Sequence, residues 1–273
     1  MIHRQQHWGL LISAIGAAFG FFSPVLFPFS DAAITNWQIT QVGKPSASSA
    51  IVVIELAPDG PLNCGIQSWD RLALADLMME LSKAQASVIA PLFPLSGPAS
   101  PQCGGILGDA KLTESIQHDN VVISANNANF FIQSAKSIGH TNLGLDIDDV
   151  LRLAPSTILE TDQTVLPWGH VVSQTYKHLT LDRNQANKNH FKTSGWLRWS
   201  DQTYTKFSDT KILALKKSNI STLQRIVQDK IVVLVPKEHS RFTINTPFGE
   251  KLAAPYAHIE VLQDSLSGNT LKP

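Results

Sequence analysis

The sequence predicts an α/β fold with a mixed, partly parallel sheet flanked by helices and preceded by one N-terminal transmembrane helix. Two short apolar runs, Ile51–Ile54 and Ala86–Ala90, are typical of buried strands. Between them, apolar residues recur at helical spacing from Leu74 to Leu81. Strand, helix and strand with short connections form a βαβ unit, so the two strands should run parallel.

The transmembrane helix is predicted at residues 8–29, which contain no charged side chain. About 20 apolar residues at helical rise match a hydrocarbon core of ~30 Å. Arg4 precedes this run and Asp31 follows it, and the asymmetry places the N-terminus in the cytoplasm. We therefore expect a cytoplasmic stub at 1–7, an anchor at 8–29 in the inner membrane and an extracytoplasmic, periplasmic domain at 31–273.

A cleaved signal peptide is the alternative to an anchor, because Ser30 and Ala32 are compatible with a small-residue cleavage site. The apolar core of a signal peptide is normally ~7–15 residues long, which is shorter than this run. An uncleaved anchor is therefore favoured over a signal peptide.

Composition and cysteine content restrict the possible partners. The chain has 273 residues, and its 22 basic and 22 acidic side chains cancel. Neither nucleic acid nor an anionic lipid surface beyond the anchor is therefore an expected partner. The two cysteines, Cys64 and Cys103, lie in Gly- and Pro-rich loop sequence. In an oxidising compartment such a pair favours a disulfide, although two free thiols or two buried small hydrophobic residues also fit.

Local signals define the other elements in the first half of the domain. Asp31–Val42 is mildly amphipathic and is expected to be a helix. Cys64–Ser68 is expected to be a loop, and Asp70 opens the helix that separates the first two strands. A short helix at Asp109–Gln117 then leads to a β-branched strand at Asn120–Ala125.

The second half begins with two strand-like runs, Thr141–Ile147 and Leu151–Ile158, around the acidic turn Asp148-Asp149. This pattern predicts a hairpin. A helix is expected at Trp168–Leu179 and a half-buried, alternating strand at Gly195–Trp199. The C-terminal part contains the strongest core strand, at Ile231–Val235, and a last helix at Pro255–Leu266 that ends before Gly268.

Several short motifs follow one another in a defined order along the exported part of the chain. They are a strand ending in Glu55, Trp69-Asp70-Arg71, Val88-Ile89-Ala90, Gly139-His140-Thr141-Asn142, Asp146-x-Asp148 with Arg152, Lys230–Val235, Thr246-Pro247 and His258. In this order they resemble the type-two CHASE domain, the extracytoplasmic sensory domain of bacterial transmembrane receptors, over residues 31–273. Two positions depart from the family pattern, because Pro91 replaces an acid and Pro236 replaces a glycine.

The resemblance implies which side chains are structural or face a ligand, without separating the two roles. These are Glu55, Trp69, Arg71, Asn142, Asp146, Asp148, Arg152 and His258. It also implies an α/β fold and a role in signal transduction rather than in catalysis.

The acidic segment Asp146–Asp149 could in principle bind calcium. A calcium loop needs about six oxygen ligands and often a distal glutamate, whereas Val150 and Leu151 follow here. A solvated turn is therefore favoured, in which Asp148 or Asp149 pairs with Arg152.

The sequence does not favour an enzyme. It contains no G-x-S-x-G motif, phosphate loop or dinucleotide-binding glycine fingerprint. Glu55 and Asp59 could form a carboxylate pair beyond the first strand, but nothing positions a partner acid beside them. His258 lies among apolar residues and is expected to be a core histidine rather than a general base. No catalytic residue, cofactor or metal is predicted.

The predicted function is that of a membrane-anchored extracytoplasmic sensor domain, which binds an unknown signal or partner and relays it across the membrane. A partner protein or a second copy of the chain is expected to carry the output. The alternatives are a periplasmic interaction or scaffold module without a small-molecule ligand, and a periplasmic hydrolase.

Overall fold

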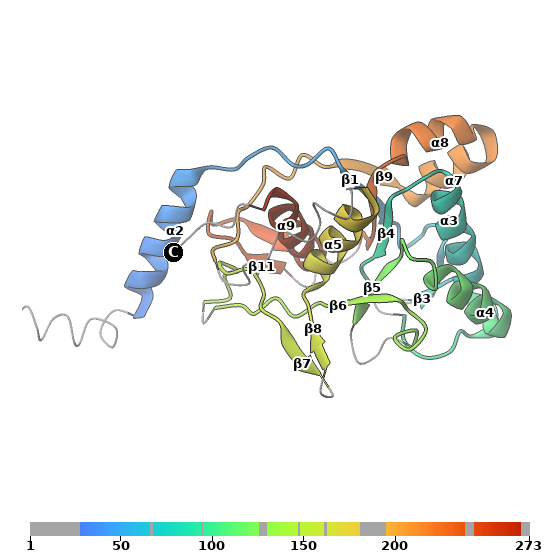
Figure 1. The fold of residues 1–273 in the computed structure, drawn as a ribbon, viewed down its shortest axis with the longest axis horizontal. Coiled ribbons are helices and arrows are strands. Elements are labelled where there is room, and N and C mark those ends of the chain that lie inside the picture. The colour runs from blue at the N-terminus through green and yellow to red at the C-terminus, as the bar shows by residue number, and fades with distance from the viewer. Residues whose placement is uncertain are drawn as a thin grey trace, which may run out of the picture. The chain divides into compact units, whose positions relative to one another are not determined.

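The computed structural model describes residues 28–65, 68–93, 95–125, 130–146, 148–160, 163–180, 195–237 and 243–268 (Figure 1). The chain divides into two compact units, Met1–Gly43 and Lys44–Pro273. In the first unit, α2 (Pro28–Val42) confirms the helix predicted at its end. The predicted anchor at 8–29 lies outside the described residues except for its last two positions. Within the described ranges, no helix combines the length and the apolar character needed to cross a membrane.

A four-stranded parallel sheet forms the centre of the second unit. Its strands lie in the order β4 (Val88–Pro91), β10 (Ile231–Pro236), β1 (Ile51–Leu56) and β9 (Thr205–Ser208). β1 and β4 are parallel, as predicted, but they are not adjacent, because β10 pairs with both of them. Every residue of β10 is buried, as expected for an apolar strand that is covered on both faces.

A second parallel pair lies beyond β4. β5 (Val122–Ala125) pairs with β6 (Ser137–His140), and one parallel bridge joins Ile89 of β4 to Val121. The antiparallel pairs of the described chain form separate two-stranded sheets, so the main sheet is parallel rather than mixed. They are β2 (Asn63–Gly65) with β3 (Ser68–Trp69), β7 (Ile158–Glu160) with β8 (Gln163–Val165), and β11 (Thr243–Asn245) with β12 (Lys251–Ala253).

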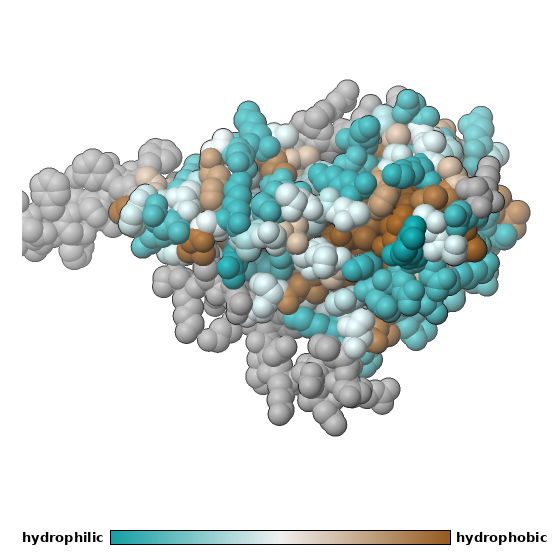
Figure 2. All heavy atoms as spheres, turned by 90° about the horizontal axis from the view of Figure 1, so that it is seen from above, coloured by the Kyte–Doolittle hydropathy of each residue, from teal (hydrophilic) through white to brown (hydrophobic). Residues whose placement is uncertain are grey.

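Helices cover both faces of the sheet, which confirms the α/β class (Figure 1). One apolar cluster holds residues of α3 (Arg71–Lys83), α4 (Gly105–Ile116), α7 (Asp209–Ser218) and α8 (Ile220–Val227). The other holds residues of α5 (Trp168–Thr180) and α9 (Ala254–Ser267). Alternate residues of β10 belong to the two clusters, as the pleat of a strand requires. The face shown in Figure 2 is mostly hydrophilic, with its largest group of apolar residues toward the right of the view and smaller groups elsewhere.

The helix boundaries have local causes. Asp70 caps α3, because its carboxylate accepts hydrogen bonds from the backbone N–H groups of Leu72 and Ala73. α9 ends where predicted, at Gly268, which adopts the left-handed conformation that favours glycine. The predicted helices at Asp109–Gln117 and Trp168–Leu179 correspond to α4 and α5.

The hairpin predicted at Thr141–Ile147 and Leu151–Ile158 is wrong. In the described residues of this segment, Val150 beside the turn bridges to Asn245, and Leu153 bridges to Trp196, so the second run pairs with another part of the chain. The physical reason lies in partners that are distant in the sequence, while Arg152 returns to the acids before it and holds the turn. The hairpin of this region is β7–β8, which begins only at Ile158.

Other differences arise where short elements depend on distant partners. The strand predicted at Gly195–Trp199 contributes only the bridge between Trp196 and Leu153. The predicted loop Cys64–Ser68 contains part of the β2–β3 hairpin. The sequence analysis also missed β9, α7, α8 and the β11–β12 pair, whose short or weakly patterned sequences gave little signal.

The predicted disulfide is present in the structure. Cys64 of β2 is bonded to Cys103 of the 3₁₀ helix η1 (Pro101–Cys103), across a sequence separation of 39 residues. Closing a loop of this length stabilises the fold by roughly 4 kcal/mol on chain-entropy grounds. The bond joins the connection after β1 to the connection after β4.

Candidate functional site

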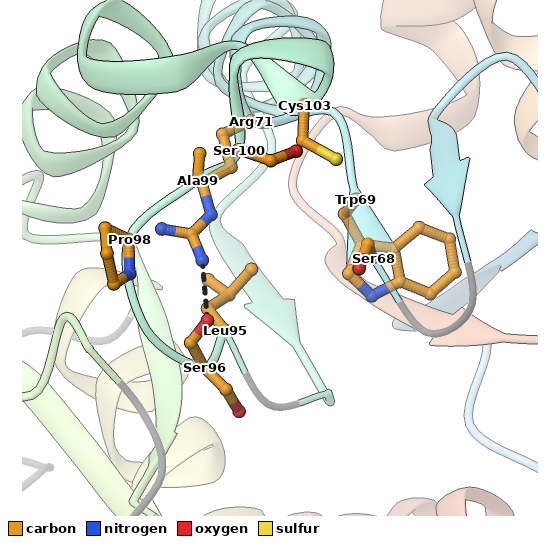
Figure 3. A pocket seen from close by; sticks show the side chains of 9 residues that line it. All are labelled: Ser68, Trp69, Arg71, Leu95, Ser96, Pro98, Ala99, Ser100 and Cys103. Atoms are coloured by element: carbon orange, nitrogen blue, oxygen red, sulfur yellow. Dashed lines mark hydrogen bonds between the residues drawn. The ribbon is translucent and has the colours of Figure 1, made fainter.

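A cavity of about 230 Å³ lies between the connections that follow β1 and β4 (Figure 3). Its walls are Ser68, Trp69, Arg71, Leu95, Ser96, Pro98, Ala99, Ser100 and Cys103. Ser68 and Trp69 come from the connection between β1 and α3, Arg71 is the first residue of α3, and the other six come from the connection between β4 and α4. The cavity is therefore associated with the carboxyl ends of two parallel strands.

The topology explains why a cavity forms there. β1 and β4 lead to α3 and α4, whereas β10, which lies between them, leads to α9 on the opposite face. The two connections that line the cavity therefore run to the same face of the sheet, one on each side of β10. Open α/β sheets characteristically bind ligands outside the carboxyl ends of their strands.

Arg71 holds one wall of the cavity in place. Its Nη1 donates to Asp109 Oδ1, and its Nη2 donates to the carbonyl oxygens of Ser96 at 3.0 Å and Gly97 at 2.7 Å. The other oxygen of Asp109 accepts a hydrogen bond from the backbone N–H of Ala99 at 3.0 Å. Arg71 is 6% exposed, so the ion pair is largely removed from solvent screening. Together these two side chains fix the loop at 96–99.

Two further contacts, one at Trp69 and one at Arg71, position the residues around the cavity. The Trp69 indole points away from the Arg71 guanidinium in Figure 3 and packs on Phe93, with ring centroids 5.1 Å apart. α4 approaches the start of α3 closely, because a Cβ on Gly108 would lie 3.2 Å from the Cβ of Arg71. A side chain at this position would need a shift of a few tenths of an ångström between α4 and the start of α3.

The structure brings only two of the predicted motif residues, Trp69 and Arg71, to this cavity. Glu55, near the end of β1, instead accepts a hydrogen bond from the hydroxyl of Tyr256 on α9. Burial and the adjacent Glu55 raise the pKa of Tyr256. Lys206 lies 4.2 Å from the centre of the same ring, so Glu55 belongs to a contact between β1, β9 and α9.

Arg152 joins two predicted motif acids in a separate cluster. Its guanidinium donates to Asp146 at 2.8 Å and to both oxygens of Asp148 at 2.7 and 2.5 Å. Arg152 is 4% exposed, and its hydrogen bonds lower the pKa of Asp148. Asp148 is thus the predicted partner, Asp146 is an additional one, and Asp149 is exposed. Among the described residues, no group of acidic, histidine or cysteine side chains is arranged to hold a metal ion.

Asn142 and His258 lie near a group of buried histidines. The backbone N–H of Asn142 donates to His140 Nδ1 at 3.2 Å, and His140 Nε2 contacts the Ser156 carbonyl at 2.9 Å. His258, on α9, is 8% exposed, and burial together with His140 lowers its pKa to about 3. Burial lowers the pKa of His170, on α5, to about 4. His258 and His170 are therefore held neutral, and the burial of His258 agrees with the core position predicted for it.

The sequence analysis missed Asp109, which it placed at the start of a helix without a role. The only signal was an acid within a Gly- and Pro-rich region, and its pairing with Arg71 follows from the packing of α4 on α3. It also missed a buried network in which Glu260 accepts hydrogen bonds from the hydroxyls of Ser200 at 2.9 Å and Tyr204 at 2.7 Å. Burial raises the pKa of Glu260.

The Arg152 cluster leads to a stability prediction with a matched control. Asp148→Asn should destabilise the protein by ~2 kcal/mol, because it leaves a buried guanidinium short of a carboxylate. Asp149→Asn changes an exposed carboxylate of the same turn and should have little effect. Unfolding in urea measures both. If Asp148→Asn lowers the free energy of unfolding no more than Asp149→Asn does, the pairing of Arg152 with Asp148 contributes little to stability.

The buried histidines predict a dependence on pH. A histidine whose folded-state pKa is lowered contributes stability above its ordinary pKa of 6.5, and this contribution is lost as the pH falls toward about 3. Between pH 6.5 and about 3, the free energy of unfolding of the wild-type protein should therefore fall by about 1.4 kcal/mol per pH unit relative to that of His258→Gln. Urea unfolding of the two proteins between pH 4 and 7 measures this difference. Parallel profiles would contradict a neutral, buried His258.

Comparison with known proteins places the whole domain in one family. The CHASE2 domain matches residues 11–273. The chain matches no curated protein. It also matches no solved structure. Because the family match extends over most of the sequence, the chain belongs to the CHASE2 domain family, whose members are extracytoplasmic sensory domains.

Proposed function

We propose that this chain is a membrane-anchored sensor that binds a small molecule in the cavity between the β1 and β4 connections. The observation that carries the proposal is the position of that cavity at the carboxyl ends of β1 and β4, the end of the strands at which open α/β sheets characteristically bind ligands. Two residues of the family motif, Trp69 and Arg71, line it. A ligand that touches both connections would favour one relative arrangement of α3 and α4, and this difference is the signal.

The proposed location is outside the cytoplasm, with residues 8–29 as the anchor in the inner membrane. The charge asymmetry between Arg4 and Asp31 supports this orientation. The disulfide between Cys64 and Cys103 supports it independently, because such bonds persist in oxidising compartments. Output would pass to a partner protein or to a second copy of the chain. A scaffold module without a ligand is the second candidate, and it differs by leaving the cavity unused.

The orientation can be tested with reporters fused after Pro273. A phosphatase that folds only outside the cytoplasm should be active there, because one span with a cytoplasmic N-terminus exports everything after it. A fluorescent protein that folds only in the cytoplasm should be dark at the same position. The reverse pattern would overturn the proposed location.

The role of the cavity can be tested without knowing the ligand. The dialysable small molecules of a periplasmic extract should raise the melting temperature of the wild-type chain, because a ligand that binds the folded state stabilises it. Ala99→Trp fills the cavity and should abolish the shift. Leu179→Trp, at an exposed position on α5, is the matched control and should keep it. A shift that survives in the Ala99 variant, or is absent from all three proteins, would contradict a ligand site here.

A further inference from the structure

The charge of the cavity restricts what it can bind. Of the described residues that line it, Arg71 is the one with an ionised side chain, and Asp109 neutralises it through a direct ion pair. The side chains of the pair are 7% and 15% exposed. A charged ligand would therefore bring an uncompensated charge next to an ion pair that is already satisfied. The free-energy cost of removing that ligand from water would not be offset by a new ion pair.

The cavity nevertheless offers several hydrogen-bonding groups. The hydroxyl of Ser68 belongs to one wall, and those of Ser96 and Ser100 belong to the other (Figure 3). A hydroxyl both donates and accepts. A guanidinium has five N–H donors, and the bonds to Asp109, Ser96 and Gly97 use three of them. Both terminal nitrogens of Arg71 are therefore already bonded to the protein.

The volume of the cavity limits the size of a ligand that it can enclose. A volume of about 230 Å³ corresponds to roughly eight water molecules at ~30 Å³ each. This space fits a single sugar ring or a short polyol. It excludes a nucleotide or an oligosaccharide from full enclosure.

We infer that the cavity binds a small, uncharged, hydroxyl-rich molecule, of the class of monosaccharides and sugar alcohols. The inference rests on the proposed function, because it names the ligand class of the same site. Hydroxyl groups of such a ligand would form hydrogen bonds with the hydroxyls of Ser96 and Ser100. Leu95, Pro98 and Ala99 would cover its carbon atoms.

The experiment compares probes that share one carbon skeleton and differ in charge. Glucose and mannitol, gluconate and glucosamine are titrated into the full chain in lipid nanodiscs, and binding is measured by calorimetry. We expect the uncharged pair to bind, and the anion and the cation to bind at least tenfold more weakly. Ser100→Ala should weaken binding of the uncharged probes by about tenfold, the loss of one hydrogen bond. Ser221→Ala, on α8, is the matched control and should leave it unchanged.

The outcomes separate the ligand class from the proposed function. Preferential binding of gluconate or glucosamine that Ser100→Ala weakens would overturn the uncharged class while retaining a sensor cavity. Equal binding to the wild-type chain and to Ala99→Trp would show that the sugars bind elsewhere and would overturn the inference. Absence of binding by all four probes would also overturn it, and the extract experiment would then decide separately whether the cavity binds any small molecule.

Discussion

The structure depends on the position of β10 between β1 and β4. Residue by residue, Ile231–Pro236 pairs with Ile51–Leu56 on one side, and Ile231–Leu234 pairs with Val88–Pro91 on the other. The strand that completes the sheet is therefore encoded about 140 residues after β4, and its side chains enter both apolar clusters. Neither helical layer has a complete surface to pack against until this strand is in place. The fold is thus strongly non-local, which is a property of slowly folding topologies.

The same arrangement creates the candidate site. Because β10 lies between β1 and β4, the connections that follow these two strands reach the α3–α4 face from either side of it and line the cavity. Two constraints then hold the walls: the Cys64–Cys103 disulfide joins them covalently, and the Arg71–Asp109 pair fixes the loop beside them. Pro91 and Pro236, the two departures from the family pattern, are buried at the ends of β4 and β10. They remove backbone N–H groups at the carboxyl ends of these two strands.

The sequence predicted those parts of the structure whose causes are local. The apolar strands β1, β4 and β10, the helix opened by Asp70, and the pairing of Arg152 with Asp148 all follow from patterns within a few residues. The failures have a common physical origin, because the segments at 141–158 and 195–199 take their conformation from distant partners such as Asn245. The candidate cavity belongs to the same category. Trp69 and Arg71 could be singled out by motif, but Asp109 became a partner of Arg71 only through the packing of α4 on α3.

Amide hydrogen exchange of the full chain, followed by mass spectrometry, tests the central role of β10 most directly. If β10 is the strand on which the sheet depends, the amides of 231–235 should exchange as slowly as those of β1, and both should require global unfolding. The two-stranded β7–β8 pair should exchange much sooner, because it is not part of the main sheet. Rapid exchange in 231–235 with continued protection of β1 and β4 would contradict the account, because the sheet would then persist without the strand placed at its centre.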